Sequence, residues 1–169
     1  MSLDDYSKLL DFIGKTPHDK IGILGGEPTL HPNFIDIIKI SKEKNIKNSF
    51  VLFTNGIELE KYLPLLEDFS ILINYNNPEY LTDIQKKKLN NTLDTMYSTG
   101  RLSREKRGFI GCNIHMNCTN YDYLWDIVDK YQLKIIRCSV VSPGGIYINW
   151  KNNKDEYFNK MKPIYLDFC

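Results

Sequence analysis

The most restrictive feature of this sequence is its regular alternation of short apolar runs with amphipathic segments. Runs with the length and residue types of buried strands lie at 20–24, 49–53, 70–75, 109–116 and 134–141. Segments with helical periodicity lie at 4–13, 33–44, 58–66, 81–97 and 121–131, with a weaker one at 154–161. Strands that alternate with helices pair in parallel. We therefore expect an α/β fold with a parallel sheet, which periodicity alone assigns neither to an open sheet nor to a barrel.

Length, composition and charge limit the classes of protein to which this chain can belong. The chain has 169 residues, of which 42% are hydrophobic and 25% charged, with a net charge of +1. These values are typical of one soluble domain and argue against nucleic acid or a membrane surface as the main partner. Because we find neither a signal peptide nor an apolar run of about 18 residues, we expect a cytoplasmic protein. The absence of alanine is typical of AT-rich genomes and suggests a bacterium.

Turn-forming and polar residues are concentrated where the expected strands end. In parallel α/β folds, ligands bind at the carboxyl ends of the strands. The residues at those ends are Gly25-Gly26-Glu27, Thr54-Asn55-Gly56, Asn74 with Asn76, and Ser142-Pro143. This placement predicts a small-molecule site at that edge of the sheet.

The segment Gly25-Gly26-Glu27-Pro28 has two interpretations. Adjacent glycines let a ligand approach the main chain, whose carbonyls accept hydrogen bonds from an ammonium group, and Glu27 adds a negative charge. Pro28 fixes the turn. A plain strand-to-helix turn with a solvated glutamate fits equally well. The segment is not a phosphate loop, because it matches neither GxGxxG nor GxxxxGK[ST].

Asparagines at the next two strand ends are further candidates. Asn55 is either a turn residue or a group that supports the site from behind. Asn74 and Asn76 lie two residues apart on a strand and so point to one face, where their amides suit hydroxyl or carbonyl groups such as those of a ribose. A polar strand end without a ligand is the alternative.

Other polar residues receive structural interpretations. Arg137 lies in an apolar strand, so we expect it to be buried and paired with a carboxylate, that of Glu27 or of a ligand. Residues 101–107 read as a solvated basic loop. Cys112 and Cys138 read as small buried hydrophobes. Of the histidines, His31 reads as structural, His115 as packing or pocket-facing, and His18 as a surface residue.

Two segments carry a family resemblance. Gly25-Gly26-Glu27-Pro28, followed by Leu30-His31-Pro32, resembles the GGEP segment of radical S-adenosylmethionine enzymes, and Leu52 to Gly56 resembles their third strand with its TNG ending. The resemblance covers about residues 4–142. It implies strands two to six of a partial (β/α)6 barrel of parallel strands, with S-adenosylmethionine across the strand ends. It also implies that Gly25, Gly26 and Glu27 hold the methionine amine, and that Asn74 and Asn76 contact ribose or substrate.

The chain departs from that family in one respect. The family's CxxxCxxC loop binds a 4Fe-4S cluster that reductively cleaves S-adenosylmethionine to start radical chemistry, and this sequence has no such loop. We therefore expect residues 1–169 to be one truncated core domain, with a barrel part at 4–142 and an extension at 143–169. The cluster ligands would then lie upstream, and this chain alone would be inactive.

The resemblance also implies partners. The parent enzyme would take its electron from a donor such as flavodoxin or ferredoxin and act on a substrate that the sequence does not specify. Cys169 would be an auxiliary-cluster ligand or a stray terminal cysteine. The alternative to an enzyme fragment is a non-catalytic α/β domain that binds a small molecule with an amine.

Overall fold

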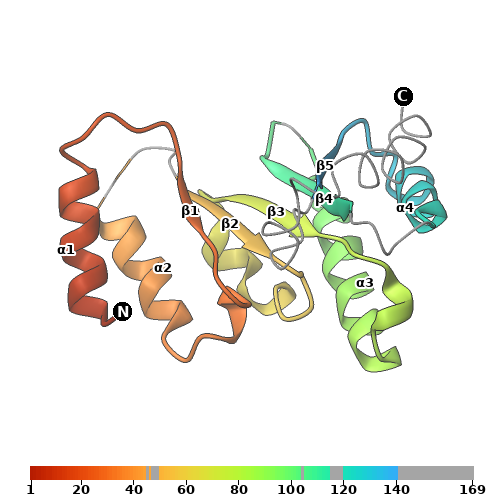
Figure 1. Ribbon diagram of the computed structural model, residues 1–169, viewed down its shortest axis with the longest axis horizontal. Coiled ribbons are helices and arrows are strands. Elements are labelled where there is room, and N and C mark those ends of the chain that lie inside the picture. The colour runs from red at the N-terminus through yellow and green to blue at the C-terminus, as the bar shows by residue number, and fades with distance from the viewer. Residues whose placement is uncertain (45, 47–49, 104, 115–119, 141–169) are drawn as a thin grey trace, which may run out of the picture.

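The computed structural model describes residues 1–44, 46, 50–103, 105–114 and 120–140 (Figure 1). Strands and helices alternate along the chain, with η denoting a 3₁₀ helix. Their order is α1 (Leu3–Ile13), β1 (Ile21–Ile23), η1 (Pro28–Leu30), α2 (Phe34–Glu43), β2 (Phe50–Thr54), η2 (Glu60–Leu66), β3 (Ser70–Asn74), η3 (Pro78–Tyr80), α3 (Asp83–Ser98), β4 (Gly108–Ile114), α4 (Asp122–Tyr131) and β5 (Ile136–Val140).

Among the described residues, five strands form one parallel sheet in the order β1-β2-β3-β4-β5. The expected α/β fold is therefore confirmed. Each crossover moves one strand farther in the same direction, whereas the order of a doubly wound sheet reverses. When right-handed crossovers always advance in one direction, their helices all lie on one face of the sheet. This arrangement is consistent with the expected partial barrel. Figure 1 shows α1, α2 and α3 in that order along one side of the strands.

The core lies between the sheet and these helices. Alternate strand residues such as Leu52, Ile71 and Ile73 are fully buried and pack with Leu10 of α1 and Leu93 of α3. Because strand side chains alternate between faces, the residues between them, such as Phe53, point to the opposite face. The site lies on this opposite face.

One expected helix has a different form. The pattern at 58–66 predicts an α-helix, but Glu60–Leu66 is a 3₁₀ helix with Pro64 inside it. Proline has no N–H to donate and its ring crowds the preceding turn, so an α-helix is disfavoured here. Three expected features lie outside the described residues: the helix at 154–161, Ser142-Pro143, and the last two residues of the expected fourth strand.

None of the helices in the described part of the chain combines the length and apolarity that a membrane crossing requires.

Candidate functional site

The carboxyl ends of the first four strands line one cavity of about 350 Å³. This volume lies within the usual range for small-molecule sites, about 300 to 1,000 Å³. Its lining consists of Leu24, Gly25, Gly26, Glu27, Phe53, Thr54, Asn55, Asn74, Asn76 and Asn113. The structure thus brings together six of the seven residues that the sequence suggested for cofactor binding.

Gly25 and Gly26 present bare main chain to this cavity. Their φ angles are 117° and 39°, and both residues are exposed. A Cβ atom added at either position would meet no atom within 4 Å. Glycine is therefore required by the backbone conformation rather than by crowding, and the main chain on both sides stays accessible to a ligand.

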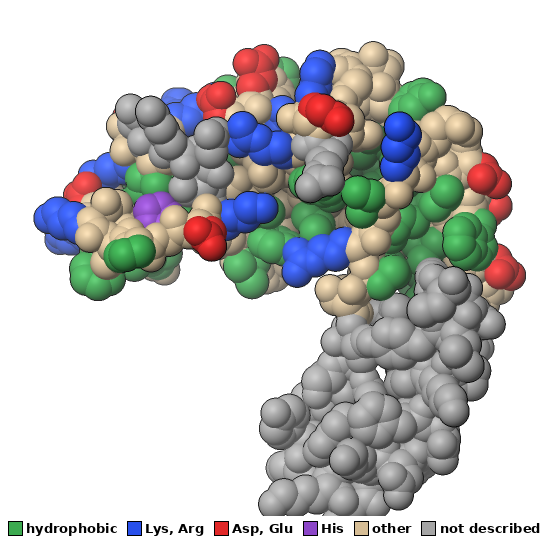
Figure 2. All heavy atoms as spheres, turned by 90° about the horizontal axis from the view of Figure 1, so that it is seen from above, with side chains coloured by type: hydrophobic (Ala, Val, Ile, Leu, Met, Phe, Trp, Pro, Cys, Tyr) green, Lys and Arg blue, Asp and Glu red, His purple; other side chains and the backbone are tan. Residues whose placement is uncertain are grey.

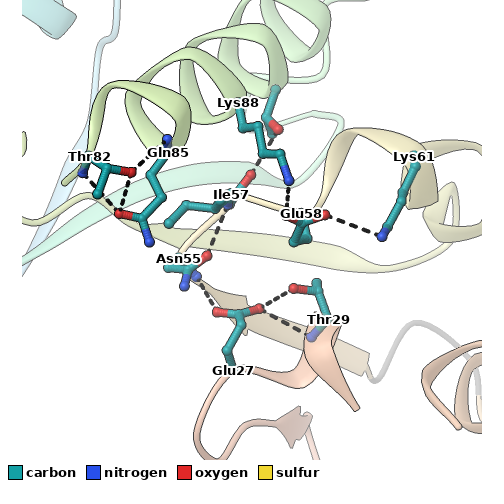
Figure 3. A network of polar contacts seen from close by, with 11 residues as sticks. Glu27, Thr29, Asn55, Ile57, Glu58, Lys61, Thr82, Gln85 and Lys88 are labelled. Atoms are coloured by element: carbon teal, nitrogen blue, oxygen red, sulfur yellow. Dashed lines mark hydrogen bonds and ion pairs between the residues drawn. The ribbon is translucent and has the colours of Figure 1, made fainter. Parts of the chain in front are cut away.

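The Glu27 carboxylate connects the ends of β1 and β2 (Figure 3). Its Oε1 accepts from the Thr29 N–H (3.2 Å), the Thr29 hydroxyl (2.6 Å) and the Thr54 hydroxyl (2.6 Å). Its Oε2 accepts from the Asn55 N–H (2.7 Å). Glu27 is thus not the solvated glutamate of a plain turn, because four donors hold its charge in place.

Residues Thr54, Asn55 and Gly56 form the other half of this connection. Thr54 is 2% exposed, and its hydroxyl also accepts from the Gly56 N–H (3.1 Å). The Asn55 Oδ1 accepts from the Ile57 N–H (2.9 Å), which closes an Asx turn. Gly56 has a φ of 78°, and a Cβ atom there would lie 2.9 Å from a Leu89 methyl group. Asn55 is therefore both a turn residue and a residue of the cavity, the two roles that the sequence suggested.

Three further amides face the cavity from β3 and β4. Asn74 ends β3, exposed Asn76 follows it, and Asn113 lies on β4. Sequence reasoning missed Asn113. The strand-end rule could have found it, because Asn113 lies near the carboxyl end of the strand expected at 109–116. His115 itself lies outside the described residues.

Pro28 does not line the strand-end cavity. It is buried at the first position of η1, where proline is favoured because its missing N–H would have no helical partner. It instead lines a second cavity of about 510 Å³ between α1, β1, η1 and α2. Its contribution to the site is to fix the direction of the turn after Glu27.

The expectation for Arg137 is wrong. Arg137 is exposed rather than buried, and its guanidinium carbon lies 5.8 Å from the centre of the Phe53 ring. Glu27 is held by other donors. Arg137 lies on β5, the last of the described strands in the order of the sheet, where fewer described elements cover a side chain than in the centre. Cys138 on the same strand is also exposed, contrary to expectation, whereas Cys112 is buried.

Arg101 is not part of a solvated loop. Its guanidinium donates to the main-chain carbonyls of Leu66 (2.6 Å), Glu67 (2.8 Å) and Phe69 (2.5 Å). Desolvation by burial lowers the pKa of Arg101, and the charge of Arg107 lowers it further. Arg101 therefore joins the loop before β4 to the end of η2.

The histidines in the described part of the chain have structural contacts. His31 follows η1, and its Nδ1 accepts from the Asn33 N–H (3.1 Å) at the start of α2. The Nδ1 of half-buried His18 lies 2.9 Å from the Thr16 carbonyl oxygen. Within the described residues, no three His, Cys, Asp or Glu side chains are grouped as metal ligands. Cys169 lies outside these residues.

The groups that line the strand-end cavity suit the parts of S-adenosylmethionine. Uncrowded glycine main chain suits an ammonium group, neutral amides suit ribose hydroxyls, and Leu24 and Phe53 offer apolar surface. The described residues do not fit a 4Fe-4S cluster. Their two cysteines, Cys112 and Cys138, fall short of the three thiolates expected, and Cys112 lies in the core.

The chain is similar to known proteins over part of its length. No family model matches the chain. The chain is 36% identical over 89 residues to a probable GTP 3′,8-cyclase of Methanococcus maripaludis strain S2, covering 53% of this chain and 30% of that protein. It is 41% identical over 68 residues to a probable GTP 3′,8-cyclase of strain C5, covering 40% of this chain and 22% of that protein. The chain thus spans less than a third of the length of these relatives.

A solved structure shows the same fold. The crystal structure of Streptococcus suis SuiB bound to S-adenosylmethionine matches 96% of this chain and 40% of that chain, with a TM-score of 0.63 and 12% identity. The fold and the cavity define a parallel α/β protein with a candidate small-molecule site at its strand ends. Together with the relatives, they show that the chain is related to the radical S-adenosylmethionine superfamily, as the GGEP and TNG segments indicated.

Proposed function

We propose that this chain forms the S-adenosylmethionine-binding part of a radical S-adenosylmethionine enzyme. The observation that carries the proposal is the strand-end cavity, where the bare main chain of Gly25 and Gly26 lies among amide side chains from neighbouring strand ends. The similarity in fold to a protein bound to S-adenosylmethionine supports it.

Each group in the cavity has a role in this proposal. Carbonyls of the Gly25-Gly26-Glu27 segment accept hydrogen bonds from the methionine ammonium group, and Asn74, Asn76 and Asn113 orient the ribose hydroxyls. The Glu27 carboxylate holds the two loops in position before the ligand arrives. Such preorganisation lowers the entropy lost on binding.

The proposal extends to the whole enzyme. Its radical chemistry requires a 4Fe-4S cluster, whose ligands we assign to residues outside the described ones, and an electron donor such as flavodoxin or ferredoxin. On this proposal the 169-residue chain binds the cofactor but does not cleave it. GTP is the first substrate to test with the whole enzyme, because it appears in the name of both relatives.

Nuclear magnetic resonance tests the binding site directly. The ¹⁵N-labelled chain is titrated with S-adenosylmethionine and, in parallel, with 5′-methylthioadenosine, which lacks the amino-acid part. We expect S-adenosylmethionine to shift the amide signals of Gly25, Gly26 and Asn74, and methylthioadenosine to shift only that of Asn74. Equal shifts at the glycines with both ligands, or no shift at the strand ends, would contradict the proposal.

Activity of the whole protein is a separate test. After anaerobic reconstitution with iron and sulfide, and with a reductant present, the full-length protein is expected to convert S-adenosylmethionine to 5′-deoxyadenosine. A full-length protein without a three-cysteine cluster loop would refute the assignment as an enzyme while leaving the binding result intact.

A further inference from the structure

Two cysteines lie side by side on neighbouring strands, on the face of the sheet opposite the candidate site. Cys112 on β4 and Cys138 on β5 are register partners, and their sulfur atoms are 3.5 Å apart. Both are thiols. Neighbouring strands are about 4.8 Å apart, which falls within the range of about 4.4 to 6.8 Å between the Cα atoms of disulfide-bonded cysteines. Side-chain rotation would therefore bring the sulfurs to bonding distance without moving the strands.

The two thiols differ in access. Cys112 is 1% exposed and belongs to the core cluster, whereas Cys138 is exposed. A dissolved reagent therefore reaches Cys138 first. Cys112 reacts most readily with the sulfur already next to it. One attacking and one resolving cysteine are what a two-step thiol exchange requires.

We propose that Cys112 and Cys138 form an oxidative modification site that closes a disulfide between β4 and β5. In the first step the Cys138 thiolate attacks a small disulfide such as oxidised glutathione, and one glutathione thiolate leaves. In the second step the Cys112 thiol attacks the Cys138 sulfur and passes its proton to the departing glutathione sulfur, so the second glutathione leaves as a thiol. Two protein thiols are oxidised to one disulfide, and one small disulfide is reduced to two thiols.

The disulfide joins β4 to β5 beside the candidate site. Asn113, which follows Cys112, points into the strand-end cavity from the opposite face of β4. The bond closes a loop of about 26 residues, which reduces the entropy of the unfolded chain. We expect the oxidised chain to melt about 5 to 10 °C higher than the reduced chain.

Mass spectrometry of cysteine variants tests the proposal. In a chain carrying Cys118→Ser and Cys169→Ser, oxidised glutathione is expected to remove two hydrogens and to block alkylation by N-ethylmaleimide until a reductant is added. Adding Cys112→Ser is expected to leave one glutathione bound to Cys138. Adding Cys138→Ser is expected to leave Cys112 unmodified.

Two results would overturn the proposal. One is a stable glutathione adduct on the chain with both cysteines, at the level seen with Cys112→Ser. The other is modification of Cys112 in the Cys138→Ser chain under native conditions. Peptide mapping of the oxidised wild-type chain requires no substitution, and there the cross-linked peptides must contain Cys112 and Cys138. A cross-link of either residue to Cys118 or Cys169 would also overturn the proposal.

Discussion

At the scale of single residues, Glu27 is the side chain on which the geometry of the candidate site depends. Its two oxygens receive four hydrogen bonds from Thr29, Thr54 and Asn55. Figure 3 shows those from Thr29 and Asn55. Hydrogen bonds to a charged acceptor are stronger than those between neutral groups. The carboxylate therefore fixes the two loops that contribute Gly26 and Asn55 to the cavity.

Replacing Glu27 by glutamine tests this role. An amide group has one oxygen, so its NH₂ must face one of the four donors. We expect Glu27→Gln to lower the free energy of unfolding by about 1 to 3 kcal/mol in urea titrations. Glu43→Gln, at an exposed position on α2, is the matched control and should change the free energy by less than about 0.5 kcal/mol. Equal effects of the two substitutions would show that the network does not stabilise the fold.

Alanine substitutions at Gly25 and Gly100 distinguish an effect on stability from an effect on ligand binding. Gly25 and Gly100 both have positive φ angles, 117° and 66°, and both have room for a Cβ atom. Alanine at either position should lower the free energy of unfolding, by about 1 to 3 kcal/mol, because of the strained backbone. Only Gly25→Ala should also weaken binding of S-adenosylmethionine, as measured by ligand titration. Equal affinities of the two variants for S-adenosylmethionine would show that Gly25 is not part of the binding site.

At the scale of elements, ion pairs and hydrogen bonds connect helices that are distant in sequence. Asp94 on α3 accepts from Lys130 (2.9 Å) and from the Tyr131 hydroxyl (2.8 Å) on α4. Glu58, before η2, similarly accepts from Lys61 and from Lys88 on α3 (Figure 3). Lysine, arginine and acidic side chains are interspersed on the face shown in Figure 2. Such exposed pairs each contribute little to stability.

The Asp94 contact predicts a dependence of stability on pH. Hydrogen bonds from Lys130 and then Tyr131 lower the pKa of Asp94 below its ordinary value of 3.8. A lowered folded-state pKa stabilises the fold above the unfolded pKa, and this contribution is lost as the pH falls through the folded value. Asp94→Asn should therefore cost about 0.5 kcal/mol at pH 7 and less near pH 3, measured by urea unfolding. An equal difference at both pH values would contradict this assignment.

At the scale of the whole molecule, the described sheet is most protected at its centre. β3 lies between β2 and β4, and four of its five residues are buried. β1 has only three residues, none of them buried, and it pairs with β2 alone among the described strands. Hydrogen exchange followed by mass spectrometry should find the slowest amides in β3 and much faster ones in β1. Equal protection of β1 and β3 would contradict this order.

Periodicity and turn residues predicted most of this architecture. All five strands and four α-helices lie where the apolar patterns placed them, because each pattern reflects which face is buried locally. The 3₁₀ form of η2 follows from Pro64, which the sequence already shows. By contrast, the exposure of Arg137 and Cys138 and the anchoring of Arg101 depend on tertiary neighbours. The bonds from Glu27 to Thr54 and Asn55 also join residues far apart in the chain, so local patterns could not reveal them.

The hydrogen bonds of Glu27 also bear on protein design. The GGEP and TNG segments are separated by a whole helix in the sequence, yet the Glu27 carboxylate of the first accepts hydrogen bonds from Thr54 and Asn55 of the second. A designer who transplants only Gly25-Gly26-Glu27 into another scaffold would carry over a half-buried negative charge without its donors. The transferable unit is therefore the pair of loops, with Thr54 and Asn55 included, and ancestral or chimeric versions of this barrel should exchange the two segments together.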